Sequence, residues 1–340
     1  MGRGNRIDEV DIAKGIGILL VVIGHSIPDA NTGIQNLWWG GIFKWIYSFH
    51  MALFMAMAGF LFWNKVEKEK DIVEKQNETL KRAKRLLIPY CFYSFIIFGA
   101  KMVFSAWSRK PVGMGTLVDV AFGNSPCGNV WFLWTLFMIS VIVLWLPRNE
   151  HPEWLMMVFG MGYFFQDSIP WFDTFGISRI LNMGVWFCVG LVMAKHYDKL
   201  ARLKEQAGWK LWICVFGTFD AQVLLLKVKE YYATILIKMM LCIVGIFLIW
   251  LISVLLIHSA KESFICSKLR FFGRESMVIY LLSYFVQTPG VTAYAKIGDF
   301  GIPYWLWVVG LAIGSITFAV IASNLVIRRN QLLSKLMIGE

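Results

Sequence analysis

Two ionisable side chains lie inside the first long apolar stretch of the chain, "DIAKGIGILLVVIGHSIPD" (residues 11–29). Such groups are costly in a segment that can enter a bilayer, and they usually face a protein interior or a wet cavity. On a helix, Lys14 and His25 share one face and are separated by about 16 Å along the axis. Asp11 falls within about 60° of the same line. The spacing predicts charges at one mouth of a helix bundle and an imidazole deeper inside.

A second histidine follows in "IYSFHMALFMAMAGFLFW" (residues 46–63). The connection at 28–41 is short, so the two segments are expected to be antiparallel neighbours with His25 and His50 at similar depth. Two imidazoles without carboxylate or thiolate partners make a poor metal site, and we expect no metal. A general base with an orienting partner is the better use of this pair.

A cation and an imidazole at this separation fit a cytoplasmic thioester donor such as acyl-CoA. Lys14 would hold the phosphates of the donor, and a neutral His25 would take a proton from an acceptor hydroxyl. The alternative is that Lys14 extends to the inner headgroups and pairs with Asp11, while His25 lies at the membrane interface. Both interpretations stay open on these residues alone.

The elements that must position these residues are membrane helices. Of the 340 residues, 58% are hydrophobic and 16% are charged, and the mean hydropathy is +0.60. A soluble domain has roughly 25% charged residues, so the composition predicts an all-α polytopic membrane protein. The expected location is the cytoplasmic (inner) membrane. With a bilayer requirement of about 20 apolar residues, about ten spans are predicted. They lie near 12–28, 42–63, 86–105, 129–147, 154–166, 180–195, 210–226, 232–257, 277–297 and 304–327.

The net charge of +11 is a topology signal and does not predict nucleic-acid binding. Most of the 33 Lys and Arg residues fall in the segments that become cytoplasmic if residues 1–11 are inside. By the positive-inside rule, both termini are predicted to be cytoplasmic. The polar stretch 64–85 is predicted to be a cytoplasmic helical connector. We therefore expect one membrane-embedded domain over residues 1–340, without a separate soluble domain.

Six scattered cysteines form no Cys-x-x-Cys pair, so neither a disulfide framework nor a zinc site is predicted. A serine nucleophile is also disfavoured, because Ser26 points about 100° away from His25 on a helix.

These motifs resemble those of the integral membrane acyltransferases of family three, which O-acylate extracytoplasmic sugars. "DIAKGIGILLVVIGH" (11–25) is similar to the first-helix signature of that family, and "FHMALFMAMAGFLF" (49–62) to its second-span motif. "KRAKRLLIPY" (81–90), "VWFLWTLF" (130–137) and "GRESMVIYLLSY" (273–284) resemble later blocks. The first motif is most similar to the fucose or sugar O-acetyltransferase branch.

The resemblance implies about ten spans and transfer of an acyl group, acetyl first, from acyl-CoA to a glycan or lipid-linked sugar. It gives His25 the position of the catalytic histidine, His50 that of the Phe-His-Met histidine, and Lys14 that of the basic residue. Arg85 matches the basic residue before Pro-Tyr, which makes it a donor-binding candidate with Lys14 and Asp11. The chain departs from the pattern at Ser283, where relatives often have histidine. The oligomeric state is left open, and a homo-oligomer is compatible with the sequence.

Two acceptor-side candidates are weighed against plainer roles. Trp131 could stack on a sugar but also suits the interface belt, and Arg179 could bind an anionic acceptor but also suits an anchor. A transporter or flippase of a sugar-linked or acyl compound is the alternative function. A membrane scaffold is a third possibility. The transporter predicts movement without acyl-CoA, and the scaffold predicts that loss of His25 or Lys14 changes nothing.

Overall fold

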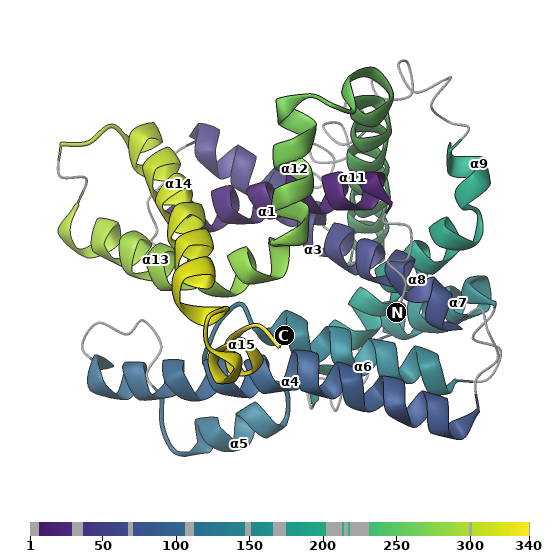
Figure 1. Cartoon of the computed structure of the whole chain (residues 1–340), viewed down its shortest axis with the longest axis horizontal. Coiled ribbons are helices and arrows are strands. Elements are labelled where there is room, and N and C mark those ends of the chain that lie inside the picture. Colours follow the sequence, from purple (N-terminus) through teal and green to yellow (C-terminus); the bar gives the residue numbers. More distant parts are fainter. Residues whose placement is uncertain are drawn as a thin grey trace. The chain divides into compact units, whose positions relative to one another are not determined.

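The computed structural model describes most of the chain, and most of the described residues are in helices (Figure 1). The residues described are 7–28, 37–66, 71–105, 112–146, 151–165, 175–201, 213, 217, 231–298 and 301–339. Within these ranges every regular element is helical, in agreement with the predicted all-α class.

Helix α1 (Asp8–Ser26) contains the first motif without interruption. Its first turn carries Asp8, Glu9 and Asp11, and negative charge there is favourable by about 0.3–1 kcal/mol per residue through the helix dipole. The helix ends at Ile27, which is extended because it precedes a proline. The prediction that Lys14 and His25 lie on one helix is therefore confirmed.

Most of the later elements overlap the predicted apolar runs, whereas the shorter helices at 115–121, 197–201, 264–274 and 331–337 lie between or after those runs. The later elements are α3 (Leu37–Val66), α4 (Ile72–Val103), α5 (Gly115–Ala121), α6 (Trp131–Trp145), α7 (Pro152–Phe165), α8 (Ile177–Lys195), α9 (Tyr197–Ala201), α11 (Tyr231–Ala260), α12 (Phe264–Arg274), α13 (Ser276–Ile297), α14 (Tyr304–Ala322), the π-helical turn η5 (Ser323–Ile327) and α15 (Gln331–Met337). The predicted connector at 64–85 is not a separate helix. Helix α4 begins at Ile72 within it and continues without a break into the third apolar run.

Five described helices are long and apolar enough to cross a membrane. They are Trp39–Val66, Ile72–Val103, Ile177–Lys195, Ala233–Ala260 and Tyr304–Ile327. Helix α6 is apolar but shorter. The predicted span 210–226 falls almost wholly outside the described residues. These helices fit a multi-pass membrane protein, whereas the total of about ten spans and the side of each terminus stay predictions.

The chain divides into two compact units, Met1–Ala58 with Met193–Val320, and Gly59–Val192 with Ile321–Glu340. In the first unit α1 packs against α11, α12 and α13. A Cβ added at Gly15 would collide with the Leu269 carbonyl on α12, and one at Gly273 would collide with the Asp11 carbonyl. Small residues allow membrane helices this close approach. The two glycines therefore let α12 cross α1 beside Lys14.

In the second unit α4 packs against α6 and α15, and Figure 1 shows α15 lying along α4. Pro89 is inside α4, where it removes one backbone hydrogen bond. The Tyr90 hydroxyl donates to the Val120 carbonyl at 2.7 Å, and Ser94 and Ser125 share a hydrogen bond of 2.7 Å. These bonds attach the segment before α6 to the middle of α4.

Candidate active site

The imidazole of His25 on α1 is hydrogen-bonded to a tyrosine on α3. The distance between His25 Nδ1 and Tyr47 Oη is 2.7 Å, and the two rings meet edge-on with centroids 5.5 Å apart. A phenol hydroxyl can donate or accept, so this contact fits either neutral tautomer of His25. Tyr47 is 37% exposed, and His25 is half-buried.

His50 lies on the other side of the contact and is 3% exposed. Its Nδ1 is 2.8 Å from the carbonyl oxygen of Ile46. A carbonyl only accepts, so Nδ1 carries the hydrogen and Nε2 of the neutral ring keeps its lone pair. The His50 ring centroid is 4.7 Å from that of Tyr47. The structure thus brings the two histidines together through Tyr47, and we call His25, Tyr47 and His50 the histidine site.

The sequence analysis did not single out Tyr47. A usable signal was present, because residues three apart on a helix are neighbours and Tyr47 precedes His50 by three. Its ring also stacks on Phe43, one turn earlier, with centroids 3.8 Å apart. Aromatic contacts on two sides therefore hold the phenol in place.

A buried amide fixes the part of α1 that carries His25. Gln287 of α13 is 5% exposed, and its Nε2 donates to the Val22 carbonyl at 2.8 Å and to Ser26 Oγ at 3.4 Å. Ser26 Oγ in turn donates to the Val22 carbonyl at 2.8 Å. The Ser26 hydroxyl is thereby engaged in the helix, which agrees with the expectation that it is not a nucleophile. Gln287 was also missed, because its partner is distant in the sequence.

The charged mouth of α1 is lined by α12. Lys14 is half-buried and directly precedes Gly15. The backbone carbonyl of Asp11 is in close contact with Gly273 of α12. Nearby, Asp8 accepts a hydrogen bond of 3.0 Å from Arg270 and has Lys261 at 4.0 Å. Residues 261–274 fall between two predicted spans, and the structure has the helix α12 there, packed against α1.

The basic block before Pro89 separates into two environments. Arg85 is exposed, whereas Arg82 is half-buried with its guanidinium carbon 4.0 Å from the centroid of the Phe62 ring. The neighbouring Glu78 is paired with Lys65 at 3.0 Å and with Lys81 at 3.6 Å. Arg82 is thus the more tightly held of the two arginines, although the sequence favoured Arg85.

The acceptor-side candidates belong to the second unit. Arg179 on α8 donates to the Gly123 carbonyl at 3.3 Å and to the Asn124 side chain. Lys101 on α4 donates to the Pro126 carbonyl at 2.8 Å. Trp131 begins α6, is half-buried, and meets Phe132 edge-on. Arg179 and Lys101 thus hold the loop 122–130, and acceptor binding by Arg179 or Trp131 stays a prediction.

Cys127 lies in the loop 122–130 and is buried. Burial raises the pKa of the Cys127 thiol to about 12, which keeps it protonated near neutral pH. No group of three or more His, Cys, Asp or Glu side chains that could hold a metal occurs among the described residues.

Comparison with known proteins gives a match to the family model described as "Acyltransferase domain", of acyltransferase family three, over residues 7–324. Nodulation protein NolL of Mesorhizobium japonicum is 30% identical over 199 residues, covering 57% of this chain and 49% of that protein. Nodulation protein NolL of Sinorhizobium fredii is 32% identical over 206 residues, covering 59% and 52%. The chain thus spans about half the length of these curated relatives. No solved structure gives a significant match.

Proposed function

The chain belongs to acyltransferase family three, and from this membership we propose that it moves an acyl group from cytoplasmic acyl-CoA to a glycan hydroxyl. The proposed acceptor is an extracytoplasmic glycan or a lipid-linked sugar, and the proposed location is the cytoplasmic membrane. Acetyl is the first donor group to test, because the first motif is most similar to the fucose or sugar O-acetyltransferase branch.

The observation that carries the proposal is the bond between His25 Nδ1 and Tyr47 Oη at 2.7 Å. If Nδ1–H donates to the phenol oxygen, the neutral imidazole has its lone pair on Nε2. A base needs that lone pair directed at the proton it removes, and a partner on the other nitrogen holds the ring in place. We assign this orienting role to Tyr47, with His50 packed behind the phenol as its support.

The proposed reaction is direct transfer. The acceptor oxygen attacks the thioester carbonyl carbon while Nε2 of His25 takes the hydroxyl proton, giving a tetrahedral intermediate. The carbon–sulfur bond then breaks, the acyl group remains on the sugar oxygen, and the CoA sulfur leaves as the thiol after receiving the proton from the imidazolium. His25 returns to its neutral form, and no covalent acyl-enzyme is required.

The donor would enter at the charged end of α1. Lys14 lies about 16 Å from His25 along the helix axis, a separation that an extended pantetheine arm can follow. Charge-assisted contacts from Lys14 would hold the phosphates, with Asp11 beside it and α12 closing one side. Arg85, which belongs to the second unit, is proposed as a further phosphate contact on the basis of the sequence motif alone.

The experiment is label transfer in inside-out membrane vesicles supplied with labelled acetyl-CoA. Alkali-labile label on glycan is expected with the wild-type protein and is expected to be lost with His25→Ala. His258→Ala is the matched control, because that histidine is exposed near the end of α11. Equal label from wild type and His25→Ala would remove His25 from the chemistry. Vesicles that move the sugar substrate without acyl-CoA and form no ester would favour the transporter.

A further inference from the structure

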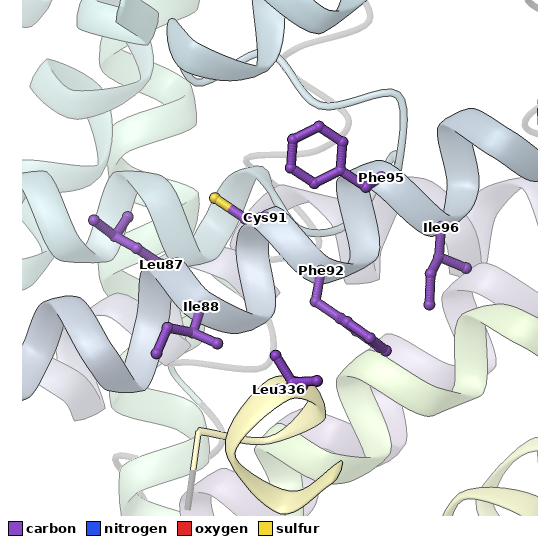
Figure 2. A pocket seen from close by; sticks show the side chains of 7 residues that line it. All are labelled: Leu87, Ile88, Cys91, Phe92, Phe95, Ile96 and Leu336. Atoms are coloured by element: carbon purple, nitrogen blue, oxygen red, sulfur yellow. The ribbon is translucent and has the colours of Figure 1, made fainter. Parts of the chain in front are cut away.

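An apolar groove with a cavity volume of about 460 Å³ opens beside α4 in the second unit (Figure 2). Its lining is entirely hydrocarbon apart from one thiol. The lining residues are Leu87, Ile88, Cys91, Phe92, Phe95 and Ile96 of α4 and Leu336 of α15. None of these side chains takes part in the proposed acyl transfer, so the groove calls for a separate explanation.

The α4 residues of the lining form one continuous stripe. Their spacing repeats every four residues from Leu87 and from Ile88, which places them on one face over about 14 Å of helix. Helix α4 is a candidate membrane span, and Phe95 and Ile96 on this face are 56% and 40% exposed. An apolar groove that follows a membrane helix over this length has the chemistry of a site for a lipid acyl chain.

One end of the groove is cationic. Lys84 lies one turn before Ile88 on the same stripe and is exposed, and Lys335 directly precedes the lining residue Leu336. Every charged residue in 81–98 and 323–338 is basic: Lys81, Arg82, Lys84, Arg85, Arg328, Arg329 and Lys335. Basic pockets beside membrane helices on the cytoplasmic side bind anionic lipid headgroups. The charge therefore selects the kind of lipid.

The end of α15 is fixed against α4 close to this cationic end. Gly339 has φ of +69°, and a Cβ there would collide with the Arg85 carbonyl. This close approach requires glycine and sets the C-terminal turn two residues before Leu87. The contacts of Leu336 and Gly339 thus place α15, which carries Lys335, against the start of the apolar stripe.

We propose that the groove binds one anionic phospholipid of the surrounding bilayer. An acyl chain lies along the stripe from Leu87 to Ile96, and Lys84 and Lys335 hold the phosphate. The lipid phosphate is assigned to Lys84 and Lys335, and neither of these lysines is assigned to the acyl donor, whereas the neighbouring Arg85 is. It would attach the C-terminal helix to α4 and to the inner leaflet together.

The test uses the purified full-length protein in detergent, with native mass spectrometry of retained lipid. Dioleoyl phosphatidylglycerol and dioleoyl phosphatidylcholine have the same chains and differ in headgroup charge. We expect the protein to retain the anionic phosphatidylglycerol in preference to phosphatidylcholine. The double variant Lys84→Ala with Lys335→Ala is expected to lower the affinity for phosphatidylglycerol by about fivefold per lysine. The matched control is Lys268→Ala, an exposed basic residue on α12 outside the groove.

A second variant tests the groove apart from the charge. Cys91 is exposed in the lining, and Cys91→Trp would fill the space while leaving both lysines in place. We expect this variant to lose retention of both lipids. Equal retention of the two lipids by the wild type, or a lysine pair that behaves like Lys268→Ala, would overturn the proposal. Unchanged lipid retention by Cys91→Trp would overturn it as well. So would a wild-type dimer that dissociates in Cys91→Trp, because a second copy of the chain would then occupy the groove.

Discussion

The histidine site and the loop 122–130 both contain polar side chains on apolar helices, but these side chains are used differently. Around the loop, Arg179 and Lys101 direct their hydrogens at the Gly123 and Pro126 carbonyls. In the histidine site, His25 and His50 each use Nδ1 for a partner within the protein. With Nδ1 of His25 as the donor, Nε2 remains for a substrate proton. The two regions therefore differ in what remains for a substrate: Arg179 and Lys101 hold backbone carbonyls of the loop, whereas His25 has a second ring nitrogen that can accept a proton.

The largest effect is expected for His25→Ala. Loss of a general base lowers kcat by about 10²–10⁴-fold, and the donor affinity should change little because the base acts on the acceptor. Initial rates of acetyl transfer and equilibrium binding of acetyl-CoA measure the two quantities. A variant that keeps most of its kcat would place the base elsewhere.

A smaller effect is expected for Tyr47→Phe, which keeps the ring contacts with Phe43 and His50 but removes the bond to His25. Misplacement of a catalytic group by about 1 Å costs about 10²-fold, so kcat should fall by up to this factor with KM for acetyl-CoA unchanged. Phe43→Leu is the control for packing alone. An equal fall in both variants would contradict an orienting role of the hydroxyl.

Two substitutions at Lys14, at the other end of α1, distinguish the effect of its charge from that of its shape. Lys14→Ala should raise KM for acetyl-CoA by about tenfold or more, since a hydrogen bond to a charged group contributes about 1.5–3 kcal/mol. Lys14→Arg should stay close to wild type, because the positive charge is kept. Steady-state kinetics with varied acetyl-CoA measures both. Equal KM values for the two variants would argue against phosphate binding.

The smallest effect on chemistry is expected for Arg179→Ala. The buried Gly123 carbonyl would lose its donor, which costs about 1–3 kcal/mol of stability. The Asn124 side chain would also lose its donor, but it is exposed and can bond to water instead. The melting temperature should fall while kcat/KM stays within about threefold of wild type. A large rise in KM for the glycan acceptor at unchanged stability would instead make Arg179 an acceptor-binding residue.

The sequence was sufficient for features that depend on one helix. Lys14 and His25 share α1 because helical periodicity places residues eleven apart on one face. Hydrophobic run length likewise located helices long and apolar enough to span a membrane, including α3 and α11. Sequence motifs also identified the family, which the match over residues 7–324 confirms.

Features that depend on how helices pack were not accessible from the sequence. The contact of Gln287 with Val22 joins segments far apart in the chain, and no sequence pattern links them. Helix α12 was treated as a loop, since eleven mixed residues are too short and too polar to register as a span. The separate environments of Arg82 and Arg85 likewise depend on which neighbours α4 meets.

The most direct test measures turnover and melting temperature together for purified His25→Ala and Arg179→Ala. The account predicts opposite outcomes: His25→Ala loses at least about 10²-fold in turnover at an unchanged melting temperature. Arg179→Ala melts earlier and keeps its turnover on the fraction that is folded. If His25→Ala retains turnover, or loses it only in step with a lower melting temperature, the histidine is a structural residue and the proposed mechanism is wrong.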